Sequence, residues 1–214
     1  MLETPIEGLY AAPPAALSFA PDTHVRAFVL RREQGNLLIY NAPGLASAAG
    51  EIEAGGGVTR QYLNHSHEAM FGAQQGIDAP VHVHERDHPA VTDSMDMATT
   101  FSAGHTLDDD FDVIPTPGHT PGATAFLWST GGRRLLFTGD SLYLRDGEWR
   151  VAVLDSSDRA AYLDSLELIR ELHFDVLVPW AATADQPYVA LTGREDARER
   201  IGAIIERVRA GSSS

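Results

Sequence analysis

The order of the apolar segments is the feature that most constrains the fold of this 214-residue chain. Through most of its length, short β-branched and aromatic runs alternate with glycine, proline and polar residues, which is typical of strands. Apolar positions at helical spacing occur late, from Ser157 and again over Arg194–Arg209. Strands followed by a helix, a strand and a helix predict an α/β fold in which helices pack outside two sheets.

We expect one domain over residues 1–214, because the chain has no internal repeat and no long linker. Ser156 or Ser157 is expected to cap the first late helix, and Gly211–Ser214 to form a disordered tail. The predicted strands are Val25–Leu30, Leu37–Tyr40, Arg60–Leu63, Pro80–His84, Phe111–Pro115, Ala123–Trp128, Arg134–Thr138, Trp149–Leu154 and Asp175–Pro179.

Composition limits the partners and the location. The net charge of −14 would repel a phosphate backbone, so we expect no nucleic acid. No segment is apolar enough to span a membrane. The N-terminus contains glutamates and two adjacent prolines, whereas a signal peptide begins with positively charged residues. We therefore expect a cytoplasmic protein without membrane contact. A homodimer is the default expectation for its assembly.

Histidines supply the first candidate metal ligands. The chain contains no cysteine, so any metal must be held by nitrogen and oxygen atoms. His65 and His67 directly follow the predicted strand that ends at Leu63. Two histidines at this spacing can converge on one ion as the chain leaves the strand. An isolated HxH pair is equally well explained by two surface histidines near a turn.

Two further segments carry the same chemistry. His119 lies in TPGHTPG at positions 116–122, where two glycines and two prolines describe a rigid turn that aims the imidazole in one direction. Asp140 ends the apolar run LLFTGD at positions 135–140. This places a carboxylate at the C-terminal edge of a strand, where layered α/β folds tend to bind ligands.

Taken together and in this order, the HxH pair, TPGHTPG and TGD resemble the motifs of the metallo-β-lactamase superfamily, which includes glyoxalase II and the persulfide dioxygenases. The resemblance extends from about Val25 to the end of the chain and is closest to glyoxalase II. It implies a four-layer αββα sandwich. It also implies that His65, His67 and His119 hold one metal ion, and that Asp140 is the carboxylate that normally bridges two.

Several positions depart from the family pattern. In the HxHxDH motif the aspartate falls on Ala69 and the last histidine on Met70, and an earlier family aspartate appears as Asn41. The final family histidine falls in PWAA, at positions 179–182, where no histidine exists. In the family each of these groups belongs to the second metal or to its support, so we expect one divalent ion at most, with zinc favoured over iron. Glu68 is a poor substitute for the missing aspartate, because neighbouring side chains normally point apart.

The resemblance implies a hydrolase that acts on a small ester or thioester, in which the ion polarises the carbonyl and Asp140 orients water. A mononuclear iron dioxygenase that uses His65, His119 and Asp140 is one alternative. A catalytically inactive binding module without metal is another, since several family positions are lost. Met70 and Trp180 place apolar volume near the site, which favours an apolar or aromatic ligand.

The remaining histidines are expected to be structural. His82, His84 and His88 imitate HxHxDH with one residue inserted, but the matching family segment holds no ligand. His105 and His173 are expected at the surface, the latter at a helix end where a cation suits the dipole.

Overall fold

The structure, a computed structural model, describes residues 1–95, 98–184 and 188–213. Seven of the described strands form the first sheet, in the spatial order β1, β2, β5, β6, β7, β8 and β9. Pairing is antiparallel from β1 to β6 and parallel from β6 to β9. In the same order, these strands are Leu2–Glu3, Leu9–Ala11, Phe28–Leu30, Leu37–Ile39, Arg60–Tyr62, Val81–His84 and Ala98–Phe101.

The second sheet contains six described strands, in the order β10, β11, β12, β13, β16 and β18. All neighbours are antiparallel except β13 and β16, which are parallel. The strands are His105–Leu107, Phe111–Pro115, Thr124–Thr130, Arg133–Gly139, Val176–Pro179 and Ala190–Leu191.

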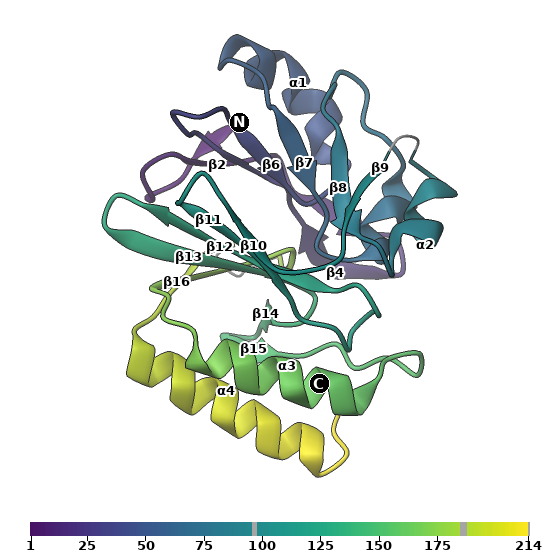
Figure 1. The fold of residues 1–214 in the computed structure, drawn as a ribbon, viewed down its shortest axis with the longest axis vertical. Coiled ribbons are helices and arrows are strands. Elements are labelled where there is room, and N and C mark those ends of the chain that lie inside the picture. The colour runs from purple at the N-terminus through teal and green to yellow at the C-terminus, as the bar shows by residue number, and fades with distance from the viewer. Residues whose placement is uncertain (96–97, 185–187, 214) are drawn as a thin grey trace.

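Helices cover the outer faces of both sheets. Helices α1 (Gly44–Ala54) and α2 (His88–Thr92) lie beside the first sheet, and α3 (Arg159–Glu171) and α4 (Arg194–Arg209) pack on the second. Figure 1 shows the resulting succession of helices, sheet, sheet and helices from top to bottom. The expected four-layer αββα sandwich is confirmed.

Aromatic side chains fill the space between the two sheets. Phe28 and Tyr40 from the first sheet contact Phe137 from the second, with ring centroids 6.2 and 6.1 Å apart. Further along, the ring of Tyr62 lies 5.2 Å from that of Phe111. All five side chains are fully buried. Because edge-on and tilted aromatic contacts are directional as well as apolar, they favour one relative placement of the sheets.

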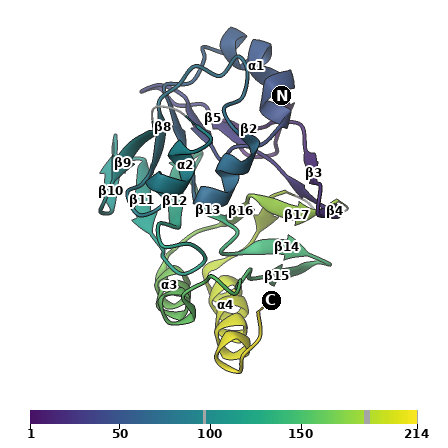
Figure 2. The same ribbon diagram turned by 90° about the vertical axis from the view of Figure 1, so that its right-hand side faces the viewer.

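A third sheet was not expected from the sequence. Its order is β15 (Glu148–Arg150), β14 (Tyr143–Arg145), β17 (Ala181–Thr183), β4 (Ala20–Val25) and β3 (Ala15–Leu17). Figure 2 shows it along one side of the sandwich, from the first sheet down to α4. The turn between β3 and β4 and the segment after β15 both lie on this side.

Two predicted strands are wrong in their extent. The predicted strand Val25–Leu30 is two strands in different sheets, because the chain bends after Val25, where β4 ends, and Phe28 then begins β5. The predicted strand Trp149–Leu154 ends at Arg150, and residues 151–154 continue without strand pairing. Val153 instead donates its backbone N–H to the Ser213 carbonyl at 3.1 Å. An apolar run indicates burial, and it does not distinguish a paired strand from a buried loop.

The cap of the first late helix and the C-terminal tail also differ from expectation. Helix α3 is capped by Asp158, which accepts from the Ala161 N–H at 3.0 Å, and the expected serine cap is wrong. Ser157 instead donates its hydroxyl to the His119 carbonyl at 3.1 Å. In the expected disordered tail, Ser213 accepts the hydrogen bond from Val153, and Ser214 lies outside the described residues. In the part of the chain that is described, no helix combines the length and apolarity needed to cross a membrane.

Tyr40 joins the two sheets by hydrogen bonds at one end of the sandwich. Its hydroxyl donates to the Val178 carbonyl at 2.7 Å and accepts from the Gly139 N–H at 2.9 Å. Both partners lie on adjacent strands of the second sheet, while Tyr40 follows β6 in the first. Burial is the main reason that the pKa of this phenol is raised, so it stays a neutral donor.

We expect Tyr40→Phe to lower the free energy of unfolding by about 1–3 kcal/mol, because two buried backbone groups lose their partner while the ring remains. Urea unfolding should show a lower midpoint with an unchanged slope. Tyr10→Phe is the control, because its hydroxyl accepts only a 3.3 Å bond from Arg31 at the surface. Equal midpoints for the two variants would contradict this role for Tyr40.

Candidate metal centre

The structure brings His65, His67, His119 and Asp140 together. His65 lies just beyond β7 and precedes a 3₁₀ helix, Ser66–Phe71, that carries His67 in its first turn. His119 lies in the turn between β11 and β12, and Asp140 follows β13. One ligand atom from each residue lies within 4.8 Å of the other three. Three segments distant in sequence therefore meet at one end of the sandwich.

The spacing of these atoms fits a divalent ion. His67 Nδ1 lies 3.0 Å from His119 Nε2, and Asp140 Oδ2 lies 3.6 Å from His65 Nε2 and 3.8 Å from His119 Nε2. Four ligands at usual zinc distances would be about 3.3 Å apart in a tetrahedron. His65 Nε2 and Asp140 Oδ1 are also buried without a hydrogen bond from any described residue. Buried polar atoms rarely lack a partner, so the donor set is suited to a cation.

Hydrogen bonding orients His119. Its Nδ1 donates to the Ala152 carbonyl at 2.7 Å, since a carbonyl can only accept. This bond fixes the tautomer in which Nε2 carries a free lone pair directed at the cluster. Burial, and then the charge of His65, lower the pKa of His119 to about 4. The imidazole is therefore neutral and able to bind metal near pH 7.

Glycine at position 139 lets Asp140 reach the cluster. Gly139 has a φ of 57°, and a Cβ there would lie 1.8 Å from Asn64 Oδ1. Asn64 in turn is held to the second sheet, because its carbonyl accepts from the Thr124 N–H at 2.8 Å. The ends of β7 and β13 thus come into direct contact. Any side chain larger than glycine would push Asp140 away from His65.

Glu68 lies directly beside the candidate ligand His65, a contact that the sequence analysis did not predict. Its carboxylate is fully buried and accepts from the backbone N–H groups of Asn64 at 2.7 Å, Asn41 at 2.8 Å and His65 at 3.3 Å. Glu68 Oε1 also lies 3.2 Å from His65 Nδ1. The expectation that Glu68 is a poor substitute for the missing aspartate stays a prediction. The 3₁₀ helix turns Glu68 back onto His65 Nδ1, and Glu68 lies outside the described group of residues with metal-ligand spacing. In the structure Glu68 is the third residue after His65, the N-cap of this 3₁₀ helix, and no motif that the sequence analysis identified marks that position.

His65 is charged between its two acidic neighbours when no metal is bound. Burial alone would lower its pKa, but Asp140 and Glu68 together outweigh burial and raise the pKa to about 10. The same contacts work in the opposite sense on Asp140, whose pKa is lowered by His65 and the other histidines despite burial. Asp140 is therefore ionised throughout the neutral range.

Asp87 is a second residue that sequence reasoning missed. Its carboxylate accepts from the Ser66 N–H at 2.8 Å, the Thr120 hydroxyl at 2.5 Å and the Gly122 N–H at 2.7 Å. It therefore ties the loop that carries His67 to the turn that carries His119. No pattern in the sequence distinguished Asp87 from the other charged residues that follow β8.

The positions that the resemblance assigns to a second metal hold Asn41 and Met70, beside Trp180, in place of carboxylate and imidazole groups. The Asn41 amide donates to the carbonyls of Glu68 and Gly72 at 3.1 and 2.9 Å. Trp180 is buried and donates its indole N–H to the Asn41 carbonyl at 2.8 Å. Met70 is 53% exposed. Asn41 and Trp180 are thus hydrogen-bonded to neighbouring carbonyl groups, and Met70 adds an exposed apolar side chain to the cleft.

The other histidines lie apart from this cluster. Among the described residues, His65, His67, His119 and Asp140 form the single group with metal-ligand spacing. The His82 ring stacks on Tyr62, with centroids 4.9 Å apart. As expected, His105 and His173 lie at the surface.

A cleft of about 510 Å³ opens over the cluster. Its polar lining includes His67, His119 and Asp140. The rest of the lining is mostly apolar and comes from the β3–β4 turn, the 3₁₀ helix, β14 and the segments around Leu154 and Trp180. The volume lies within the range of about 300–1,000 Å³ typical of small-molecule sites.

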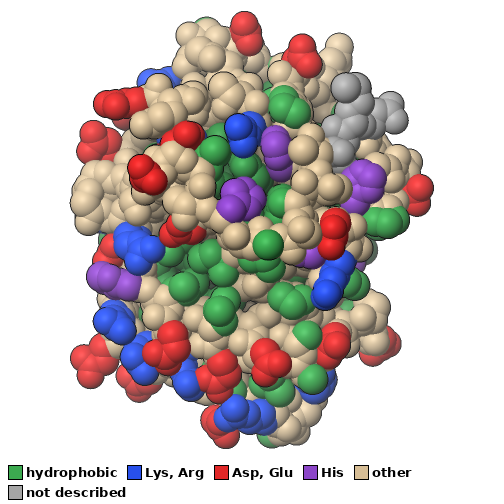
Figure 3. Space-filling model, viewed as in Figure 1, with side chains coloured by type: hydrophobic (Ala, Val, Ile, Leu, Met, Phe, Trp, Pro, Cys, Tyr) green, Lys and Arg blue, Asp and Glu red, His purple; other side chains and the backbone are tan. Residues whose placement is uncertain are grey.

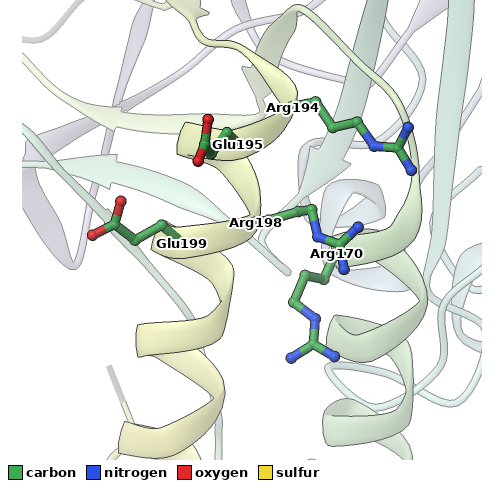
Figure 4. A pocket seen from close by; sticks show the side chains of 5 residues that line it. All are labelled: Arg170, Arg194, Glu195, Arg198 and Glu199. Carbon is green, nitrogen blue, oxygen red and sulfur yellow. The ribbon is translucent and has the colours of Figure 1, made fainter.

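A second cleft, of about 740 Å³, lies away from the cluster between α3 and α4. It is lined by Arg170, Arg194, Arg198, Glu195 and Glu199. Figure 4 shows the two glutamates directed away from the arginines. Arg198 pairs with Glu171 at 3.1 Å. Figure 3 shows this region as a mixture of acidic and basic side chains, which is ordinary for a solvated helix surface.

We expect Glu68→Ala to reduce the free energy of unfolding by about 3–5 kcal/mol, because it removes the acceptor of three buried N–H groups and leaves a charged His65 without that neighbour. Its affinity for added zinc should fall by about 10- to 100-fold, as for other carboxylates that orient a ligand histidine. Urea unfolding and a competition titration with a chelator would measure the two effects.

Glu33→Ala, at an exposed position, is the control and should change neither quantity. The free energy of unfolding and the zinc affinity of Glu68→Gln should lie between those of the wild type and of Glu68→Ala. Unchanged zinc affinity in Glu68→Ala would show that this carboxylate does not orient His65.

Comparison with known proteins agrees with the geometry. The metallo-beta-lactamase superfamily model matches residues 42–181. BJP-1, a subclass B3 metallo-beta-lactamase of Bradyrhizobium japonicum, has a TM-score of 0.62 at 15% identity, over 97% of this chain and 92% of that one. TTHA1429, a metallo-beta-lactamase family protein from Thermus thermophilus, has a TM-score of 0.63 at 18% identity, over 95% of this chain and 80% of that one.

AidC, a dizinc quorum-quenching lactonase, has a TM-score of 0.56 at 12% identity, over 80% of this chain and 76% of that one. Comparison with curated proteins gives no match. Identities this low show a shared fold and leave the glyoxalase II-like subtype a prediction. The family model, however, covers well over half of the sequence, so the chain belongs to the metallo-β-lactamase superfamily.

Proposed function

We propose that this protein is a hydrolase that uses one divalent metal ion, preferably zinc, to cleave a small ester or thioester. The observation that carries the proposal is the set of four ligand atoms within 4.8 Å of one another, next to second-metal positions occupied by Asn41, Met70 and Trp180. Three nitrogen ligands and one carboxylate suit zinc. The structural similarity to AidC, a lactonase, supports ester chemistry, because a lactone is a cyclic ester.

The three histidines and Asp140 would have different roles in the reaction. His65, His67 and His119 would hold the ion, which supplies Lewis-acid activation of the carbonyl and of water. Asp140 remains ionised, and its Oδ1 has no hydrogen-bond partner among the described residues. The Asp140 side chain lines the cleft, where its carboxylate would accept a hydrogen bond from the attacking water and orient it. Ala69 offers no carboxylate for the same task, so catalysis depends on Asp140.

The first test is elemental analysis of protein purified without added metal or chelator. We expect about one equivalent of zinc per chain, and its loss in His65→Ala, because one of the four candidate ligands disappears. Iron in place of zinc would favour the dioxygenase alternative, with His65, His119 and Asp140 as ligands. No metal after incubation with zinc would favour a binding module and refute the hydrolase.

Hydrolysis is tested with p-nitrophenyl acetate. His119→Ala should lower kcat/KM by at least about 100-fold if one of three metal ligands is lost. His173→Ala is the matched control, because this histidine lies at the surface and outside the metal-ligand group. Equal rates for the two variants would refute metal-dependent hydrolysis at this site.

Zinc affinity should rise with pH. His65 has a pKa of about 10 without metal, and a bound ion must displace its proton from Nε2. Protons therefore compete with zinc over the whole range from about pH 6.5 to 8.5, and the apparent affinity should increase about tenfold per pH unit. Chelator competition at several pH values would measure the slope. A flat profile would contradict a protonated His65.

A further inference from the structure

Three exposed apolar side chains surround the mouth of the cleft above the candidate metal centre. Phe19, Met70 and Leu154 expose 71%, 53% and 43% of their surface, and all three line this cleft. Among the described residues, the other two exposed large apolar side chains, Leu168 and Leu191, lie elsewhere. Exposed apolar residues that gather around one concavity mark a site that binds apolar groups.

The three residues come from separate segments of the fold. Phe19 lies in the turn between β3 and β4, Met70 in the 3₁₀ helix after His67, and Leu154 in the chain between β15 and α3. The third sheet, to which β3, β4 and β15 belong, therefore brings two of them to the cleft. Trp180 extends the same apolar lining towards Asp140.

Charge in the cleft is sparse. Arg145 is its one lysine or arginine among the lining residues, and it lies 3.6 Å from the neighbouring Asp146 carboxylate. Apart from the proposed metal ion, a substrate with several negative charges would find one partly neutralised cation there, on a protein with a net charge of −14. A neutral apolar group has more contacts available. The volume of about 510 Å³ suits a small molecule more than a protein segment.

We infer that the substrate is an ester or thioester with an apolar acyl chain or ring, and that Phe19 and Leu154 determine this specificity. The inference rests on the proposed function. The apolar acyl group would lie between the two side chains, with its carbonyl at His119 and Asp140. Water adds to the carbonyl carbon, the bond to the leaving oxygen or sulfur breaks, and the alcohol or thiol departs with one proton. The acid product retains the apolar group.

The test is a series of p-nitrophenyl esters from acetate to hexanoate. For the wild type, kcat/KM should rise with chain length by up to about fourfold per methylene, which corresponds to burying one methylene group. In the double variant Phe19→Ser with Leu154→Ser, the ratio of kcat/KM for hexanoate to that for acetate should fall at least about tenfold, since several methylenes lose their apolar contacts. Both side chains are substantially exposed, so the variant is expected to fold, which circular dichroism would verify.

Leu191→Ser is the matched control, because Leu191 is 65% exposed and lies outside the cleft. Its chain-length profile should equal that of the wild type. A flat profile in the wild type, alongside hydrolysis that requires His119, would overturn the inferred specificity and leave the hydrolase proposal standing.

Binding of 4-phenylbutyramide, measured by saturation-transfer NMR, separates the two proposals further. We expect binding to the wild type and the Leu191→Ser control, and at least about fivefold weaker binding to the double variant, because two apolar contacts are removed. Equal binding to all three proteins would overturn the inference whether or not hydrolysis is observed. A lack of hydrolysis would refute the proposed function independently of this readout.

Discussion

The arrangement of the site depends on the buried carboxylate of Glu68. A carboxylate without solvent is unfavourable unless it is hydrogen-bonded and paired, and here three backbone N–H groups and the His65 ring meet it. Those N–H groups belong to the segments that follow β6 and β7. One side chain therefore fixes where two neighbouring parallel strands end, and it holds the first candidate ligand between itself and Asp140.

The second sheet must then be placed against these strand ends. Tyr40 bridges to the backbone of β13 and β16, and Gly139 allows β13 to touch Asn64. Asp87 adds a link from the His67 loop to the His119 turn. Since these bonds are buried or partly buried and connect different segments, the four ligand atoms are positioned by the core and not by flexible loops. Such preorganisation reduces the cost of ordering ligands around an ion.

Two residues at positions that depart from the family pattern, Asn41 and Trp180, are hydrogen-bonded to each other. Asn41 directs its amide to the carbonyls behind the 3₁₀ helix, and Trp180 donates to Asn41. These hydrogen bonds hold Asn41 between Trp180 and the 3₁₀ helix, while Asn41 Oδ1 has no hydrogen-bond partner among the described residues. Met70, no longer a ligand, lies at the rim of the cleft. Of the three exposed apolar residues at the mouth, Met70 alone occupies one of these positions, and Phe19 and Leu154 come from other segments.

The sequence by itself determined the α/β class, helix α4 with the limits that the structure shows, and three motifs that supply the four ligand candidates. These are properties of local order, because periodicity, turn residues and motif spacing are carried by neighbouring positions. The tertiary structure decided what depends on contacts between distant segments. It divided Val25–Leu30 between two sheets, formed a third sheet, and turned Glu68 back onto His65. The packing of distant segments sets the direction of Glu68 in the 3₁₀ helix and brings Phe19 and Leu154 to one cleft. The order of residues along the chain does not specify this packing by local pattern alone.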